Sequence, residues 1–171
     1  YGKRYVNGET NSQLGVPIIL TVGNDNFPRS TVEEVYNQIN KDLDEANVLL
    51  IGYAKPNNSH LNLKVAQGLK ARVALTQGNW QIAADYANKA RSGVSLMSIA
   101  DYGAGFNDYN NKEWMWGSHI NEVQTEYFGN FGAYMSRNFS STVIRSCPKA
   151  INSKLYNMIP ATDVRSAIFD K

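Results

Sequence analysis

The sequence predicts a mainly α-helical protein, built from helical hairpins with long irregular, aromatic-rich loops and little β-structure. Two observations carry this prediction. A long amphipathic stretch over residues 30–50 precedes two further helical stretches that are separated only by a glycine turn. After residue 93 the sequence becomes rich in Gly, Asn and aromatic residues, which is typical of irregular structure.

The first helix is predicted to begin at Ser30. Ser30 and Glu33 have the spacing of a capping box, and Pro28 lies just before them. Apolar residues then recur at helical spacing and form one stripe. The stripe consists of Val32, Val35, Tyr36, Ile39, Leu43, Ala46 and Leu50. The preceding residues 1–29 are rich in Gly and Asn, and their GVPIILTV stretch is predicted to be extended, because it contains a proline.

Two further helices are predicted at Leu63–Gln77 and Trp80–Arg91. Only Gly78 and Asn79 lie between them, so the two helices must be antiparallel neighbours. Small residues allow the helix axes to approach closely: Ala66, Ala71, Ala83, Ala87 and Ala90. This spacing resembles a tetratricopeptide repeat, although its Trp, Leu and Pro signature positions are missing or shifted. One such hairpin cannot bury its own apolar faces, so the helix of residues 31–50 is the expected neighbour.

The part after residue 93 is expected to be rich in loops. The expected short elements are a strand at 113–120, irregular structure at 121–148, a helical turn at 153–159 and a short helix at 162–169. Thr162 or Asp163 is the expected cap of the last helix. Trp80, at the hairpin turn, is interpreted as a structural residue. Because both ends look cut, the chain is expected to be a segment of a longer protein.

Composition and motifs exclude several classes of function. The net charge is only +2 and the sequence has no block of Lys or Arg, so no nucleic-acid partner is expected. The single cysteine, Cys147, cannot form an internal disulfide. His60 and His119 lack partners at metal-ligand spacing, and no phosphate-binding or dinucleotide motif occurs, so no cofactor or metal is expected. Glu122 and Glu126 lie four residues apart, which leaves a glycosidase open.

The aromatic residues after residue 100 are the best candidates for a binding site. Aromatic rings stack on the apolar faces of sugars, while amide and guanidinium groups satisfy the hydroxyls. The alternative is that most of these rings belong to the core. Trp114 and Trp116 lie two apart, so in a strand both would point to one face. The candidate ligand-binding residues are Trp116, Tyr127, Phe128 and Tyr134 for stacking, with Asn130, Arg137 and Asn138 as polar partners.

Several segments in one order resemble the SusD/RagB family of outer-membrane nutrient-binding lipoproteins of Bacteroidetes. They are LGVPI, PRSTVEEVYNQINKDLDEANVLL, LKVAQGLKARVALTQGNWQIAADYANKA, NKEWMWG and LYNMIPATDVRSAIF. The block that begins at Pro28 is the most specific. Ligand-contacting positions vary widely in this family, so no residue role is carried over from it. Asp163 and Arg165 match a family pattern and are interpreted as an N-cap and its neighbouring ion pair.

The resemblance implies a SusD-like α-α superhelix with tetratricopeptide-like hairpins. Residues 1–171 would then be a single segment of a larger SusD-like domain, with a helical scaffold over 30–93 and a loop-rich part over 94–171. The implied function is non-enzymatic binding of a glycan or other nutrient at the bacterial cell surface. The ligand would pass to a SusC-like TonB-dependent outer-membrane transporter.

The implied location is the outer membrane, as a lipoprotein whose lipidated cysteine and signal peptide lie outside this segment. Cys147 is not the lipidated residue. A tetratricopeptide-type protein-interaction scaffold is the main alternative function, and a glycosidase is the third. Several tandem hairpins with a matching groove would favour the scaffold, and two carboxylates facing each other across a cleft would favour the glycosidase.

Overall fold

The structure is a computed structural model, and it describes residues 3–23, 26–106, 108–121, 123, 146–147 and 149–169. This part of the chain is mainly helical and holds no strand, which confirms the predicted fold class. The chain forms two compact units. The first unit comprises Tyr1–Leu96 with Asn110–Gly117, and the second comprises Met97–Tyr109 with Ser118–Lys171.

The helices of the first unit are α1 (Val32–Leu49), α2 (Leu63–Thr76) and α3 (Trp80–Arg91). The second unit contains the short helices α4 (Ile99–Gly103) and α7 (Ser153–Asn157) and the 3₁₀ helix η2 (Val164–Ile168). All the predicted helices are therefore present, and α2 and α3 begin at the predicted residues.

Helix α1 begins one residue later than predicted. Thr31 is the N-cap: its hydroxyl accepts a hydrogen bond from the Glu34 N–H at 3.2 Å, and the Glu34 carboxylate accepts the Thr31 N–H at 2.7 Å. The predicted capping box at Ser30 is wrong, because the Ser30 backbone already pairs with the extended segment before it. Its N–H donates to the Val16 carbonyl at 3.1 Å, and its carbonyl accepts the Gly15 N–H at 2.7 Å.

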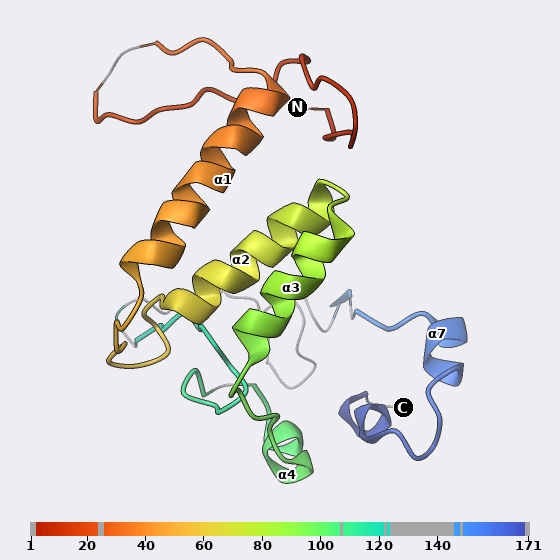
Figure 1. Ribbon diagram of the computed structural model, residues 1–171. Coiled ribbons are helices and arrows are strands. Elements are labelled where there is room, and N and C mark those ends of the chain that lie inside the picture. Colours follow the sequence, from red (N-terminus) through yellow and green to blue (C-terminus); the bar gives the residue numbers. More distant parts are fainter. Residues whose placement is uncertain are drawn as a thin grey trace. The chain divides into compact units, whose positions relative to one another are not determined.

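The α2–α3 hairpin forms as predicted, with the two helices side by side and a tight turn between them (Figure 1). Gly78 has φ +78° at the turn, a conformation that glycine adopts without steric cost. A Cβ there would lie only 3.2 Å from the Cβ of Asn7. The buried small residues of the hairpin are Ala66, Ala71, Ala74, Ala83 and Ala90. Ala87, which was also expected at the interface, is exposed.

Helix α1 packs against α2, as expected for the neighbour of the hairpin. The Lys70 side chain of α2 is buried, and its Nζ lies 2.8 Å from Oδ1 of Asp44 on α1. Asn40 of α1 donates through Nδ2 to Oε1 of the buried Gln77 at 3.1 Å. The contact between these two helices therefore combines apolar packing with paired polar groups, which satisfies the buried amide and ammonium.

The hairpin leaves an apolar groove of about 500 Å³ along one side. Its lining includes Leu75, Trp80, Ala84 and Met115. Trp80 was interpreted as structural, yet it is 66% exposed. The interface between α2 and α3 is filled by alanine side chains, so the helices are too close for an indole to enter between them.

In the second unit, Asp163 caps η2 as predicted. Its Oδ1 accepts the Arg165 N–H at 3.0 Å, and the Arg165 Nε donates to both carboxylate oxygens at 2.9 and 3.0 Å. The hydrogen bonds from Arg165 lower the pKa of Asp163 from 3.8 to about 2. The structural interpretation of this pair is confirmed.

Several aromatic rings of the second unit contact one another. Tyr102 and Phe106 meet edge to face at 5.1 Å between ring centroids, and Tyr109 stacks on His119 at 4.5 Å. These contacts give the rings partners within the fold, although Phe106 is 50% exposed.

Candidate functional site

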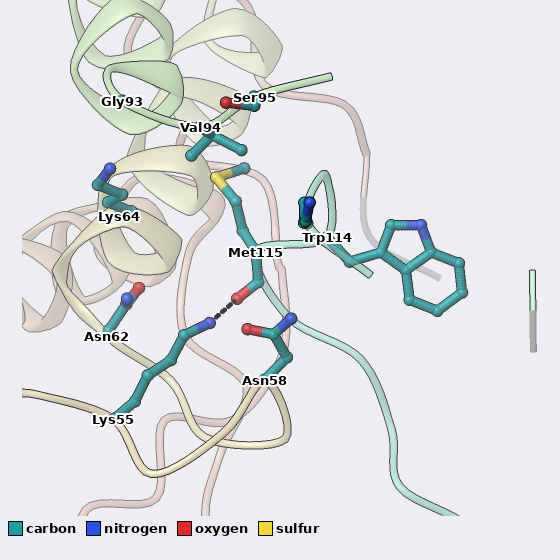
Figure 2. Close-up of a pocket in the computed structure, with 10 residues that line it drawn as sticks. Lys55, Asn58, Asn62, Lys64, Gly93, Val94, Ser95, Trp114 and Met115 are labelled. Carbon is teal, nitrogen blue, oxygen red and sulfur yellow. Dashed lines mark hydrogen bonds between the residues drawn. The ribbon is translucent and has the colours of Figure 1, made fainter. Parts of the chain in front are cut away.

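A pocket of about 400 Å³ opens on the first unit (Figure 2). Its volume lies in the range of about 300–1,000 Å³ that is usual for small-molecule sites. The loop before α2, the first turn of α2, the turn after α3 and the segment 112–115 surround it. The lining residues are Lys55, Asn58, Asn62, Lys64, Gly93, Val94, Ser95, Lys112, Trp114 and Met115.

The segment 110–117 is held against the loop before α2 by hydrogen bonds. Lys55 Nζ donates to the Met115 carbonyl at 2.6 Å, the contact that is dashed in Figure 2. The Gly117 N–H donates to the Asn58 carbonyl at 2.9 Å, and the Asn58 Nδ2 donates to the Asn111 carbonyl at 3.4 Å. The strand predicted at 113–120 is wrong, because these groups pair with an irregular loop and a lysine instead of a neighbouring strand.

Lysine side chains from three segments of the chain line the pocket. Lys55 belongs to the loop, Lys64 to the first turn of α2, and Lys112 to the later segment. Lys64 Nζ also donates to the Ser92 carbonyl near the end of α3. Burial, and secondly the charge of Lys64, lower the pKa of the Lys55 ammonium. The pocket is therefore electropositive.

Uncharged polar groups lie beside the lysines. Asn62 is the N-cap of α2 and accepts the Val65 N–H through Oδ1 at 3.2 Å, so its Nδ2 keeps its donor capacity for other partners. Asn58 and Ser95 also line the pocket. Amide and hydroxyl groups of this kind pair with the hydroxyls of a sugar, which both donate and accept.

Two indoles lie at or next to the pocket. Trp114 is half-buried and lines it, whereas Trp116 is 56% exposed and donates through Nε1 to the Ser59 carbonyl at 3.3 Å. Because this segment is not a strand, the expectation that both rings lie on one face of a strand is wrong as well. An exposed indole that is oriented by its own hydrogen bond offers a flat apolar surface next to polar groups.

Trp116 is the one predicted ligand-binding residue that the structure describes. The others lie outside the described residues and stay predictions: Tyr127, Phe128, Asn130, Tyr134, Arg137 and Asn138. Glu122 and Glu126, the carboxylates considered for a glycosidase, also lie outside them. Sequence reasoning missed the lysines and asparagines of the pocket. A signal for three of them is the loop GYAKPNNSHLN (52–62), which holds Lys55, Asn58 and Asn62. Lys64 and Lys112 lie outside this loop.

Two further observations concern the described part of the chain. Its His, Cys, Asp and Glu side chains form no group of three or more that could hold a metal ion. None of its helices combines the length and apolarity needed to cross a bilayer.

The fold and the pocket define a helical scaffold with a tetratricopeptide-like hairpin and a polar, tryptophan-flanked site. Among solved structures, the chain is similar to the crystal structure of a SusD-like carbohydrate binding protein from Bacteroides vulgatus. The two share 34% identity with a TM-score of 0.58, over 66% of this chain and 25% of that chain. This match confirms the resemblance to SusD-like proteins that the sequence motifs indicated.

The chain thus corresponds to only 25% of the length of that SusD-like protein. No protein-family model matches the chain. No curated protein matches it either.

Proposed function

We propose that this chain is part of a non-enzymatic, glycan-binding protein of the bacterial cell surface. The observation that carries the proposal is its likeness, in sequence and in fold, to a SusD-like carbohydrate binding protein. On the same basis, residues 1–171 form a single segment of a larger SusD-like domain, in which 30–93 are the helical scaffold and 94–171 the loop-rich part.

The pocket supports this proposal with the residue types that sugars need. The exposed Trp116 ring provides a stacking surface, and its Nε1 donates to the Ser59 carbonyl. Asn58 and Asn62, which precede and follow Ser59 in the same loop, provide amide groups. The other predicted ligand-binding residues, from Tyr127 to Asn138, would extend the aromatic surface.

The protein would act as an outer-membrane lipoprotein that captures an oligosaccharide or other nutrient. It would then deliver this ligand to a SusC-like TonB-dependent transporter. Such a role requires a site that binds and releases the ligand without changing it. No bond in the ligand is made or broken.

Affinity electrophoresis of the full-length protein, through gels that contain different polysaccharides, tests the proposal. Retardation by at least one glycan is expected, without release of sugars from it. Trp116→Ala should weaken binding about two- to tenfold, as expected for the loss of an aromatic stacking contact. Trp80→Ala is the matched control, because that indole is also exposed but lines the apolar groove and not the pocket.

The possible results separate the candidate functions. Release of sugars from the retarding glycan would overturn the non-enzymatic role and favour a glycosidase. Failure of every glycan to retard the protein would overturn glycan capture. Equal effects of Trp116→Ala and Trp80→Ala would remove Trp116 from the site while leaving glycan binding in place.

A further inference from the structure

The lysine side chains of the pocket carry an inference about the class of glycan, which rests on the proposed glycan-binding function. We infer that the pocket binds an acidic sugar unit, whose carboxylate or sulfate group is held by Lys55, Lys64 and Lys112.

The positive charge of the pocket is not balanced by carboxylates of the part of the chain that the structure describes. Among the described residues, no Asp or Glu lines it, and none of the salt bridges that they form with one another involves Lys55, Lys64 or Lys112. Other lysines of the same unit differ in this respect: Lys70 pairs with Asp44 at 2.8 Å, and Lys41 lies 3.9 Å from Glu45. An anionic ligand would supply the negative charge that balances these ammonium groups.

The ammonium groups keep donors for such a ligand. An ammonium has three N–H donors. Within the described residues, Lys55 uses one on the Met115 carbonyl and Lys64 uses one on the Ser92 carbonyl. Lys64 also lies in the first turn of a 14-residue helix, whose N-terminal end carries a partial positive charge that favours anions. Burial and the charge of Lys64 both disfavour the charged form of Lys55, and a bound anion would oppose both effects.

The uncharged groups around the lysines indicate an anion that is attached to a sugar. Asn58, Asn62 and Ser95 line the same pocket and match hydroxyl groups. Trp114 lines it as well, and the exposed Trp116 ring follows two residues later. A bare inorganic anion would use the lysines and leave the amides and indoles without a role. A uronic acid or a sulfated sugar would use all of them.

The test compares matched acidic and neutral polysaccharides in affinity electrophoresis of the full-length protein. Polygalacturonate is paired with its carboxyl-reduced, neutral form, and chondroitin sulfate with desulfated chondroitin. The first pair reports on carboxylates and the second on sulfates. The variants are Lys64→Gln and Lys112→Gln, which keep a polar side chain and remove the charge. Lys41→Gln, on the exposed side of α1, is the matched control.

We expect retardation by at least one acidic polymer, weaker retardation by its uncharged partner, and a decrease with added NaCl, because salt screens charges at an open site. Each pocket variant should weaken acidic-glycan binding about tenfold, the effect expected for one hydrogen bond to a charged group. Lys41→Gln should leave it unchanged. Urea unfolding of each variant shows that it is folded.

Each other result overturns the inference. Binding of neutral glycans only would overturn it while the proposed function stands. Acidic-glycan binding that neither pocket variant weakens would place the anion elsewhere. Inorganic sulfate that competes as well as a galacturonate trisaccharide would indicate a simple anion site, not a sugar site. No retardation by any polysaccharide would overturn both this inference and the glycan-binding function.

Discussion

At the start of several helices, a single polar side chain accepts a hydrogen bond from a backbone N–H group that has no partner within the helix. Thr31, Asn62, Ser98 and Asp163 each accept a backbone N–H from the first turn of the helix that follows. These N–H groups have no partner within the helix itself, so the cap decides the residue at which the helix starts.

The cap of α1 gives the first prediction. Thr31→Ala should lower the free energy of unfolding by about 1 kcal/mol, because it leaves the Glu34 N–H without its partner. Ser30→Ala should change it by less than about 0.5 kcal/mol, since the hydrogen bonds of Ser30 come from its backbone. Urea unfolding followed by circular dichroism measures both. A larger loss of unfolding free energy for Ser30→Ala than for Thr31→Ala would show that Ser30 is the N-cap.

The carboxyl of Asp163 gives the second prediction. Its pKa in the folded protein is lowered to about 2, so NMR titration should find it ionised well below pH 3.8. Because the folded-state pKa lies below the ordinary value, the pair favours the folded turn above about pH 4. This contribution is lost as the pH falls from 3.8 to about 2.

Arg165→Gln tests the cause of the Asp163 shift. Removing the guanidinium should return the pKa of Asp163 towards 3.8, because the side-chain hydrogen bond from Arg165 is the largest contribution. If the pKa of Asp163 stays near 2 in this variant, the backbone N–H of residue 165, and not the ion pair, holds the carboxylate in its charged form.

At the scale of the helices, α1 and α2 are joined by a lysine that packing has buried. Lys70 reaches Asp44 at 2.8 Å and also donates to the Asn40 carbonyl at 3.4 Å, both on α1. A buried ammonium costs free energy unless it is paired, so this contact specifies which face of α1 meets α2.

The third prediction follows from this lysine. Asp44→Ala should lower the free energy of unfolding by about 1–2 kcal/mol, because it leaves the Lys70 ammonium without its countercharge. Glu45→Ala, one residue along α1, breaks only the exposed pair with Lys41 at 3.9 Å and should cost less than about 0.5 kcal/mol. Urea unfolding compares the two variants. Equal losses would show that the Lys70 pair contributes no more than a surface contact.

At the scale of the first unit as a whole, residues far apart in the sequence meet at the pocket. The segment Asn110–Gly117 packs against the loop before α2. In the sequence it is separated from the rest of the first unit by residues 97–109, which belong to the other compact unit. Met115 lines both the lysine pocket and the apolar groove, and its methyl lies 4.0 Å from the Cβ position of Gly68 on α2. The pocket therefore exists only when this segment is docked.

The fourth prediction concerns this docking. Lys55→Met removes the hydrogen bond to the Met115 carbonyl, so exchange of the nearby Gly117 amide hydrogen should become about tenfold faster. The Glu33 amide, bonded to the Asn11 carbonyl at 3.0 Å, is the internal reference and should not change. Native-state hydrogen exchange measures both. Unchanged exchange at Gly117 would show that Lys55 does not hold the segment.

Much of the helical part follows from local sequence patterns. The stripe of α1, the glycine turn at Gly78 and the caps of the short late helices depend on residues within a few positions of one another. Such short-range patterns can be read directly from a sequence. The N-cap lies at Thr31 and not at Ser30 because of a contact between residues farther apart in the sequence. The backbone of Ser30 is hydrogen-bonded to the backbone of Gly15 and Val16.

By itself, the sequence determined the helical elements other than α4, the hairpin and the resemblance to SusD-like proteins, because all of these are carried by contiguous motifs. Only the tertiary structure decided that Lys55, Lys64 and Lys112 line one pocket, that 113–120 is not a strand, and that Trp80 is exposed. The physical reason is that each depends on which distant backbone and side-chain groups pair after folding. A pattern of neighbouring residues does not contain that information.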